Sequence, residues 1–145
     1  MPASEARFAA RSLTAGSAHG QAVKLTEPLN AWGELDPKTG VIVHQGHPQH
    51  GKSLAGKVLV MWESRGSGAN AQVFAQVWAN EKGPVGIILA VPDYVLCVGA
   101  VVSNEVYGIS CPIVVLDAND YDDLIDGNYL TIDSSEEGAT VTVQQ

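Results

Sequence analysis

Short apolar runs recur through the middle of this chain. Residues 58–61, 85–90 and 111–116 are rich in β-branched side chains and carry almost no polar residue. An uninterrupted apolar run of this length is typical of a strand that is buried on both faces. The three runs therefore predict a parallel sheet in the core of the protein.

Amphipathic segments separate these runs. Residues 70–81 carry apolar side chains at the spacing of one helix face, and Gly83 and Pro84 follow as a stop signal. Residues 94–107 predict a second helix that ends before Gly108. The middle of the chain is thus β-α-β-α-β, an order that implies parallel strands with right-handed crossovers.

The flanking segments have a different pattern. We expect strands at residues 21–26, 41–43, 128–133 and 140–143, a hairpin turn at 134–138 and a short helix at 119–125. The end strands must pair with each other or with an adjoining sheet. Residues 1–10 are predicted to be an irregular lead-in, and residues 1–145 a single domain.

Composition excludes some classes of partner. The 145 residues are 46% hydrophobic with a net charge of −8, which argues against nucleic acid or an anionic membrane as the main partner. No apolar run reaches the roughly 18–20 residues that cross a bilayer, and the first residues do not resemble a signal peptide. Cys97 and Cys111 lie in apolar surroundings without metal or redox spacing, so we expect free thiols and a cytoplasmic location.

The segment from Glu63 to Gln72 is the strongest candidate for a site. It joins a predicted strand to a predicted helix through small residues, and it contains Arg65, Gly66 and Ser67. Backbone N–H groups at a helix start favour an anion, and a guanidinium fits a carboxylate. The alternative is that Ser67 is only a helix N-cap.

Two other polar clusters have competing interpretations. Asp36 precedes Pro37, so it could belong to a site or simply to a turn. His44, His47 and His50 recur every three residues, but Pro48 and nearby glycines argue against the helix that would align them on a metal. We therefore assign no metal site to this chain.

Taken together, the motifs resemble the small subunit, or swivel domain, of the aconitase X family. The resemblance runs from about residue 14 to residue 143 and depends on the joint order of Trp32-Gly33, Asp36-Pro37, Thr39-Gly40, His47-Pro48, Gly51, Ser53-Leu54, Gly56-Lys57, Arg65-Gly66-Ser67, Gly83-Pro84, Gly99 to Val102, Tyr107-Gly108 and Pro112. It implies an α/β fold, the swivelling β/β/α domain of the aconitase and isopropylmalate isomerase small domain.

The resemblance also implies a function. The chain would be one subunit of a hydro-lyase (a dehydratase) acting on a small hydroxylated carboxylate, with cis-3-hydroxy-L-proline as the first candidate and phosphomevalonate as the alternative. Ser67 would be the catalytic base, Arg65 and Gly66 would contact the substrate, and Asp36 and His47 would be further substrate contacts. An iron or iron–sulfur centre is expected on a large subunit, without which this chain would be inactive.

Two departures from the family pattern bear on the substrate. Glu34 stands where a glycine is usual, and Gly68, Ala69 and Asn70 replace small residues that often carry hydroxyl or thiol groups. A non-catalytic binding or assembly module of the same fold is therefore an alternative. A phosphohistidine carrier is a weaker one, because the candidate loop holds no histidine.

Overall fold

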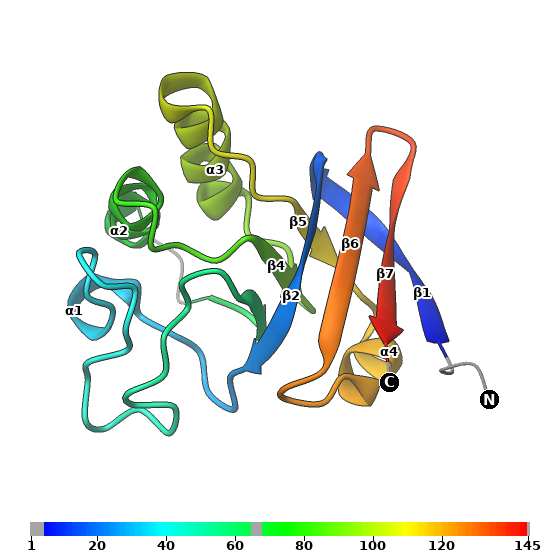
Figure 1. Cartoon of the computed structure of the whole chain (residues 1–145), viewed down its shortest axis with the longest axis horizontal. Helices are drawn as coiled ribbons and strands as arrows, with labels where there is room; N and C mark the ends of the chain where they lie inside the picture. Colours follow the sequence, from blue (N-terminus) through cyan, green and yellow to red (C-terminus); the bar gives the residue numbers. More distant parts are fainter. Residues whose placement is uncertain (1–4, 65–67, 145) are drawn as a thin grey trace.

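The computed structural model describes residues 5–64 and 68–144. Within these ranges the elements are β1 (Glu5–Thr14), β2 (Gly16–Lys24), α1 (Ala31–Glu34), β3 (Val58–Met61), α2 (Gly68–Ala79), β4 (Gly86–Leu89), α3 (Tyr94–Tyr107), β5 (Ile113–Val115), α4 (Ala118–Asp123), β6 (Tyr129–Ser135) and β7 (Gly138–Gln144). Helices α1, α2 and α3 lie on one side of the strands (Figure 1).

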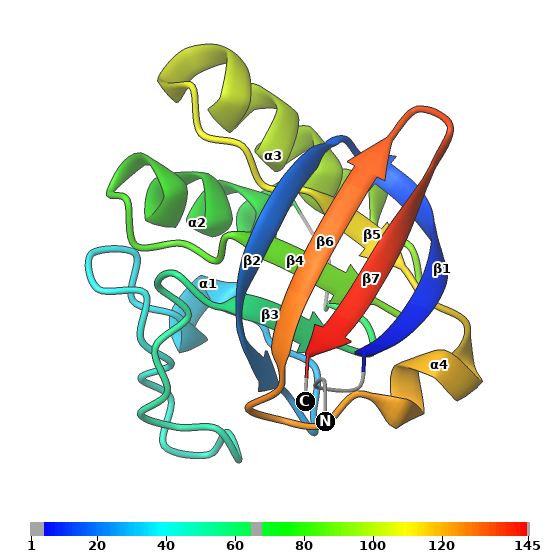
Figure 2. The ribbon, with the colours of Figure 1, turned by 45° about the vertical axis from the view of Figure 1, so that its right-hand side comes forward.

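The strands close into a barrel in the order β1-β5-β4-β3-β2-β6-β7, with β7 returning to β1. Strands β2, β3, β4 and β5 are parallel neighbours, whereas β1, β6 and β7 pair antiparallel (Figure 2). The predicted α/β class and parallel core are confirmed. The predicted flanking strands pair both with each other and with the parallel strands, because β2 joins β6 on one side and β3 on the other.

Side chains of β3 alternate between two hydrophobic cores. Val58 and Val60 point into the barrel, with β6 and β7 on its far wall, while Leu59 and Met61 pack toward α2 and α3. All four side chains are fully buried. Burial on both faces explains why this strand is an unbroken apolar run in the sequence.

The helices end at recognisable signals. Asp93 caps α3 by accepting a hydrogen bond from the N–H of Leu96 at 3.0 Å, and Gly108 terminates it in the left-handed conformation. Residues 94–107 are the helix that the sequence predicts. In the parts of the chain that the structure describes, no helix is both long and apolar enough to cross a bilayer.

The prediction of an irregular lead-in over residues 1–10 is wrong from residue 5 onward. Glu5 begins β1, which pairs with β7 from Glu5 opposite Gln144 to Ala10 opposite Ala139. The segment does alternate polar and apolar residues, but its inward positions include Ala6 and Ala10, which have low β propensity. The continuous antiparallel pairing of residues 5–10 with β7 overrides that local preference.

The predicted strand at residues 41–43 is also wrong. Only isolated bridges form there, between Leu35 and Ile42 and between Val41 and Ser53. Ile42 is nevertheless fully buried against the helical side of the sheet. Its apolar character therefore reflects a loop that packs on the core.

Gly40 provides a test of this packing. It has a φ of +73°, and a Cβ built there would lie 2.1 Å from the carbonyl oxygen of Lys82. Gly56 is a matched control, because its φ is +71° and an added Cβ would meet nothing within 4 Å. We expect Gly40→Ala to lower the free energy of unfolding by about 1–3 kcal/mol more than Gly56→Ala does. Urea denaturation of both variants measures the difference, and equal losses would contradict the overlap.

Candidate active site

The carboxyl ends of β3 and β4 frame the candidate site. Strand β3 ends at Met61 and α2 begins at Gly68, so the predicted strand–loop–helix arrangement is confirmed. Arg65, Gly66 and Ser67 lie outside the described residues, and their assigned roles stay predictions. In α/β folds, whether the sheet is open or closed, ligands commonly bind at the carboxyl ends of parallel strands, which is where this loop originates.

The segment leading into this loop is fixed to the next βα connection. The carbonyl oxygen of Trp62 accepts hydrogen bonds from the N–H groups of Ala90 at 3.0 Å and Val91 at 2.9 Å. The Ser64 hydroxyl donates to one carboxylate oxygen of Asp93, whose other oxygen caps α3. Asp93 therefore joins the entry to the candidate loop to the start of α3, a role that the sequence analysis missed.

The first turn of α2 is fixed from its other side by Asn70. This side chain is only 2% exposed, and its Oδ1 accepts a hydrogen bond from the N–H of Trp32 at 3.2 Å. Its amide group also donates to the carbonyl of Leu29 at 3.5 Å. Asn70 thus attaches the segment containing α1 to the helix start, and Trp32 is left 66% exposed beside it.

The side chain of Glu34, the last residue of α1, folds back to the start of this helix. One carboxylate oxygen accepts the N–H of Asn30 at 2.7 Å, and the other lies 3.8 Å from Nε2 of His44. Because α1 docks on the first turn of α2 through Asn70, this carboxylate adds negative charge to the surroundings of the site.

Asp36 is engaged in a turn. Its Oδ1 accepts the N–H of Lys38 at 2.9 Å, and its carbonyl accepts the N–H of Gly40 at 2.8 Å. This geometry supports the turn interpretation of the Asp-Pro motif. A substrate contact by Asp36 stays a prediction.

His47 is buried, with 4% of its surface exposed. Its Nδ1 accepts the N–H of Gln49 at 3.0 Å, so the hydrogen-bond pattern assigns the ring proton to Nε2. Among the described residues, Nε2 has no hydrogen-bond partner. The structure therefore leaves one buried donor available at His47, while no hydrogen bond between described residues joins His47 or Asp36 to the first turn of α2.

Potential metal ligands do not converge in the described ranges. Over residues 5–64 and 68–144, no three His, Cys, Asp or Glu side chains are arranged to hold an ion. Cys97 and Cys111 are buried and free, as predicted. Burial, with a smaller contribution from Asp93, raises the pKa of Cys97 to about 11, and burial also raises the pKa of Cys111. Both are poor nucleophiles at neutral pH because the thiolate is scarce.

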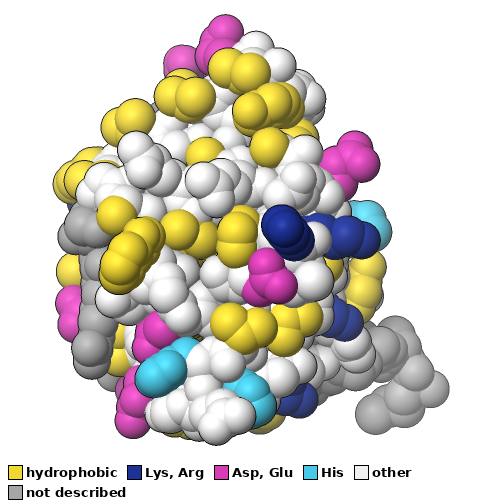
Figure 3. All heavy atoms as spheres, turned by 90° about the vertical axis from the view of Figure 1, so that its left-hand side faces the viewer, with side chains coloured by type: hydrophobic (Ala, Val, Ile, Leu, Met, Phe, Trp, Pro, Cys, Tyr) yellow, Lys and Arg dark blue, Asp and Glu magenta, His cyan; other side chains and the backbone are white. Residues whose placement is uncertain are grey.

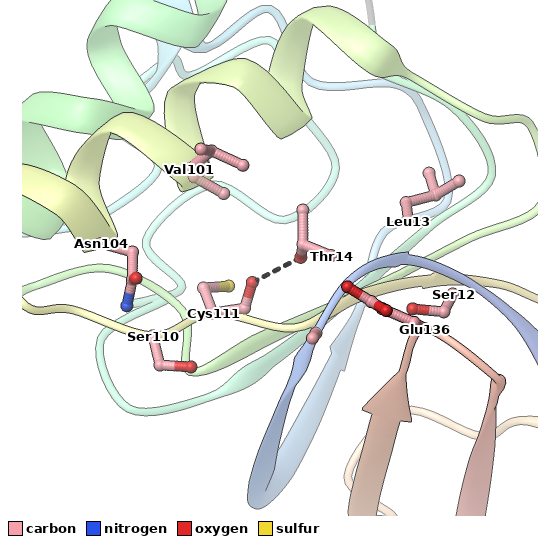
Figure 4. A pocket seen from close by; sticks show the side chains of 10 residues that line it. Ser12, Leu13, Thr14, Val101, Asn104, Ser110, Cys111 and Glu136 are labelled. Atoms are coloured by element: carbon pink, nitrogen blue, oxygen red, sulfur yellow. Dashed lines mark hydrogen bonds between the residues drawn. The ribbon is translucent and has the colours of Figure 1, made fainter.

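A hollow of about 500 Å³ lies elsewhere, between α3, the end of β1 and the β6–β7 turn (Figure 4). It is near Cys111, just before β5, and so at the amino ends of the parallel strands. Thr14 in its wall already donates to the carbonyl of Cys111 at 2.9 Å, and Glu136 is its charged lining residue. The charge and position of this hollow do not suit an anionic substrate.

Comparison with known proteins agrees with this architecture. Residues 7–143 match the aconitase X swivel domain family. The structure resembles Thermococcus kodakaraensis aconitase X in its holo form, with a TM-score of 0.82 and 27% identity, over 97% of this chain and 99% of that one. The chain belongs to the aconitase X swivel domain family, and the resemblance seen in the sequence is confirmed.

Two kinds of curated relative have similar identity. The chain is 33% identical over 131 residues to the phosphomevalonate dehydratase small subunit of Methanosarcina mazei, covering 90% of this chain and 87% of that one. It is 35% identical over 106 residues to the cis-3-hydroxy-L-proline dehydratase of Pseudomonas aeruginosa, covering 73% of this chain. That match spans only 18% of the Pseudomonas protein.

Proposed function

We propose that this chain is the small subunit of a two-chain aconitase X-type hydro-lyase. The observation that supports this proposal most strongly is the match to a dehydratase small subunit over almost the full length of both chains. The strand–loop–helix order from β3 to α2 supports the proposal, because loops that follow the carboxyl ends of parallel strands commonly bind ligands in α/β folds.

The reaction removes water from a β-hydroxy acid. In the proposed mechanism the alkoxide of Ser67 takes the proton from the α-carbon, the electrons of that C–H bond form the double bond to the β-carbon, and the bond from the β-carbon to its hydroxyl breaks. Over a full turnover the departing hydroxyl gains the proton that Ser67 gave up in forming its alkoxide, so the products are the alkene and water. Arg65 binds the carboxylate, whose negative charge grows in the transition state. Gly66 leaves space for the substrate beside the backbone.

The serine hydroxyl is a weak base near neutral pH, so Ser67 must act as its alkoxide. The environment must therefore stabilise the negative charge that forms when the hydroxyl loses its proton. A guanidinium and a helix N-terminus both stabilise negative charge, and the proposal places Ser67 beside each of them. An iron or iron–sulfur centre held by the large chain would supply the Lewis acid for the departing hydroxyl. The Nε2–H of His47, which has no hydrogen-bond partner among the described residues, is a candidate donor to substrate or to the site loop.

We favour cis-3-hydroxy-L-proline over phosphomevalonate as the substrate. The described segments around the candidate loop are the first turn of α2 (68–71), residues 29–35 docked on it through Asn70, residues 61–64 at the loop entry, and residues 90–95, which are hydrogen-bonded to that entry. They carry Glu34, Glu63 and Asp93 and contain no lysine or arginine, although Arg11 contacts Tyr94 at their edge. With Arg65 assigned to the carboxylate, these three acidic residues disfavour a second anionic group such as a phosphate and accommodate an amino acid that carries a cationic ring nitrogen.

Reconstitution tests the proposal. The chain, the aconitase X large chain of the same organism and their mixture would each be incubated with cis-3-hydroxy-L-proline or with phosphomevalonate, and loss of water followed by mass spectrometry. We expect turnover only in the mixture and only with the proline derivative. Turnover by the lone chain would overturn the subunit assignment, and preference for phosphomevalonate would overturn the substrate assignment alone.

A further inference from the structure

The outward face of α3 is apolar. Its exposed residues include Tyr94, Tyr107 and five valines, with Val98 62% and Val106 64% exposed. The exposed polar positions on this helix are Asn104 and Glu105. A helix on the surface of a soluble domain ordinarily turns charged and polar residues outward, so this face is the reverse of the usual pattern. Figure 3 shows apolar side chains gathered on the helical side of the molecule.

The core of this chain does not account for these valines. Helix α3 already packs inward through Leu96, Cys97 and Ala100. Exposed helix positions are filled best by alanine or by long polar residues, because a β-branched side chain loses rotamer freedom against the preceding turn. Valine at the exposed positions 95, 98, 101, 102 and 106 therefore weakens the isolated helix while adding apolar surface. Apolar patches of this kind mark interaction sites.

The face is continuous with the candidate active site. Val91, which follows the carboxyl end of β4, is 38% exposed, and its N–H donates at 2.9 Å to the carbonyl of Trp62 at the entry to the candidate loop. The Trp62 ring itself packs against Tyr121 of α4 and is not part of this face. Val91 lies just before α3, and Tyr94 and Val95 open the helix. One apolar strip, defined by Val91, Tyr94, Val95, Val98 and Val102, thus runs from the carboxyl end of β4 along α3.

We propose that this apolar strip is the docking surface for the large chain of the dehydratase. The inference rests on the proposed function, which needs a second polypeptide at the same end of the barrel. In the Pseudomonas relative about four fifths of the protein lies outside the region matched to this chain, so a domain of this family has a much larger polypeptide to pack against. A second copy of this chain is disfavoured as occupant because each copy carries a net charge of −8. The matching surface on the large chain is apolar and poor in charge.

The decisive variant keeps the helix and removes the contact. In the double variant Val98→Ala, Val102→Ala, alanine has the higher helix propensity, so the thermal midpoint should hold or rise. We expect the Kd for the large chain to increase about 10-fold, and Val98→Glu to increase it about 30-fold or more. Ile125→Ala and Ile125→Glu are matched controls, because Ile125 is 66% exposed and follows α4, outside the strip. The controls should leave Kd unchanged.

Three results separate the possibilities. If the wild-type chain binds the large chain and the α3 variants bind as tightly as the Ile125 controls, the docking inference is overturned while the proposed function stands. If the wild-type chain does not bind the large chain at all, the proposed function is overturned, and the docking inference is overturned with it. Light scattering of the chain alone measures its oligomeric state. A wild-type dimer that Val98→Glu converts to a monomer would show that a second copy covers the strip, and would overturn the inference.

Discussion

Replacing Ser67 with alanine is expected to lower turnover by the reconstituted two-chain dehydratase by about two orders of magnitude or more. Alanine cannot accept the α-proton, and no other side chain in the loop from Arg65 to Ala69 carries a hydroxyl group. If Ser67 acts only in proton transfer, kcat should fall while KM changes little. Initial rates over a range of cis-3-hydroxy-L-proline concentrations measure both constants.

Ser17→Ala is the matched control for that experiment. Ser17 is exposed on β2, and its hydroxyl donates to Asp133 at 2.8 Å, in the barrel wall formed by β2 and β6. It should leave both constants unchanged. An unaltered rate in Ser67→Ala would contradict the base assignment. If the two chains still formed a complex, that result would favour the non-catalytic assembly module.

The largest expected loss of stability follows Trp78→Ala. Trp78 is 1% exposed on the inward face of α2, where its ring lies 5.7 Å from that of Phe74. Its Nε1–H also donates to the carbonyl of Pro84 at 3.0 Å. Removing the ring leaves a cavity and an unpaired carbonyl, so we expect the free energy of unfolding to fall by about 3–5 kcal/mol. That is a large part of the roughly 5–15 kcal/mol that holds a typical domain together.

Chemical denaturation in urea measures this loss of stability. Two further variants separate the contribution of the hydrogen bond from that of the buried ring. Trp78→Phe keeps most of the apolar volume but removes the donor, so its smaller loss, about 1–3 kcal/mol, reports the unpaired Pro84 carbonyl. Trp62→Ala removes a ring that is 42% exposed and should cost less than Trp78→Ala. Equal losses for Trp62→Ala and Trp78→Ala would show that the burial of Trp78 does not determine its contribution.

The central part of the fold was predictable because its signals are local and agree with each other. Strands β3, β4 and β5 are apolar on both faces, so each is visible as a run. Helix α3 was located to the residue, and Gly108 is the stop signal that marks its end.

The missed elements depend on distant partners. Strand β1 is stabilised by β7, more than a hundred residues away in the sequence, and its small inward residues give a weak strand signal. Helix α1 contains Gly33 at a φ of +90° and has only four residues, so no periodicity could indicate it. Ile42 shows the opposite error, since an apolar triplet packed as a loop has the same sequence signal as a short strand.

The surroundings of the candidate site were only partly predictable. The strand–loop–helix arrangement followed from the apolar pattern, but the supports of the loop did not. Asp93 could have been found, because an aspartate immediately before a predicted helix is a common N-cap. Asn70 carried no such signal: its importance comes from its contacts with Trp32 and Leu29 across the fold.

The pairing of the first and last strands has a consequence for how such a module can be connected. Glu5 lies opposite Gln144, so polypeptide attached before β1 or after β7 would leave the barrel from one place. Covalent fusion at either point would leave every strand in register. The same domain can therefore be part of a longer polypeptide or a separate subunit with no change in its architecture. Its relatives include both a long protein that contains a matching region and a separate small subunit.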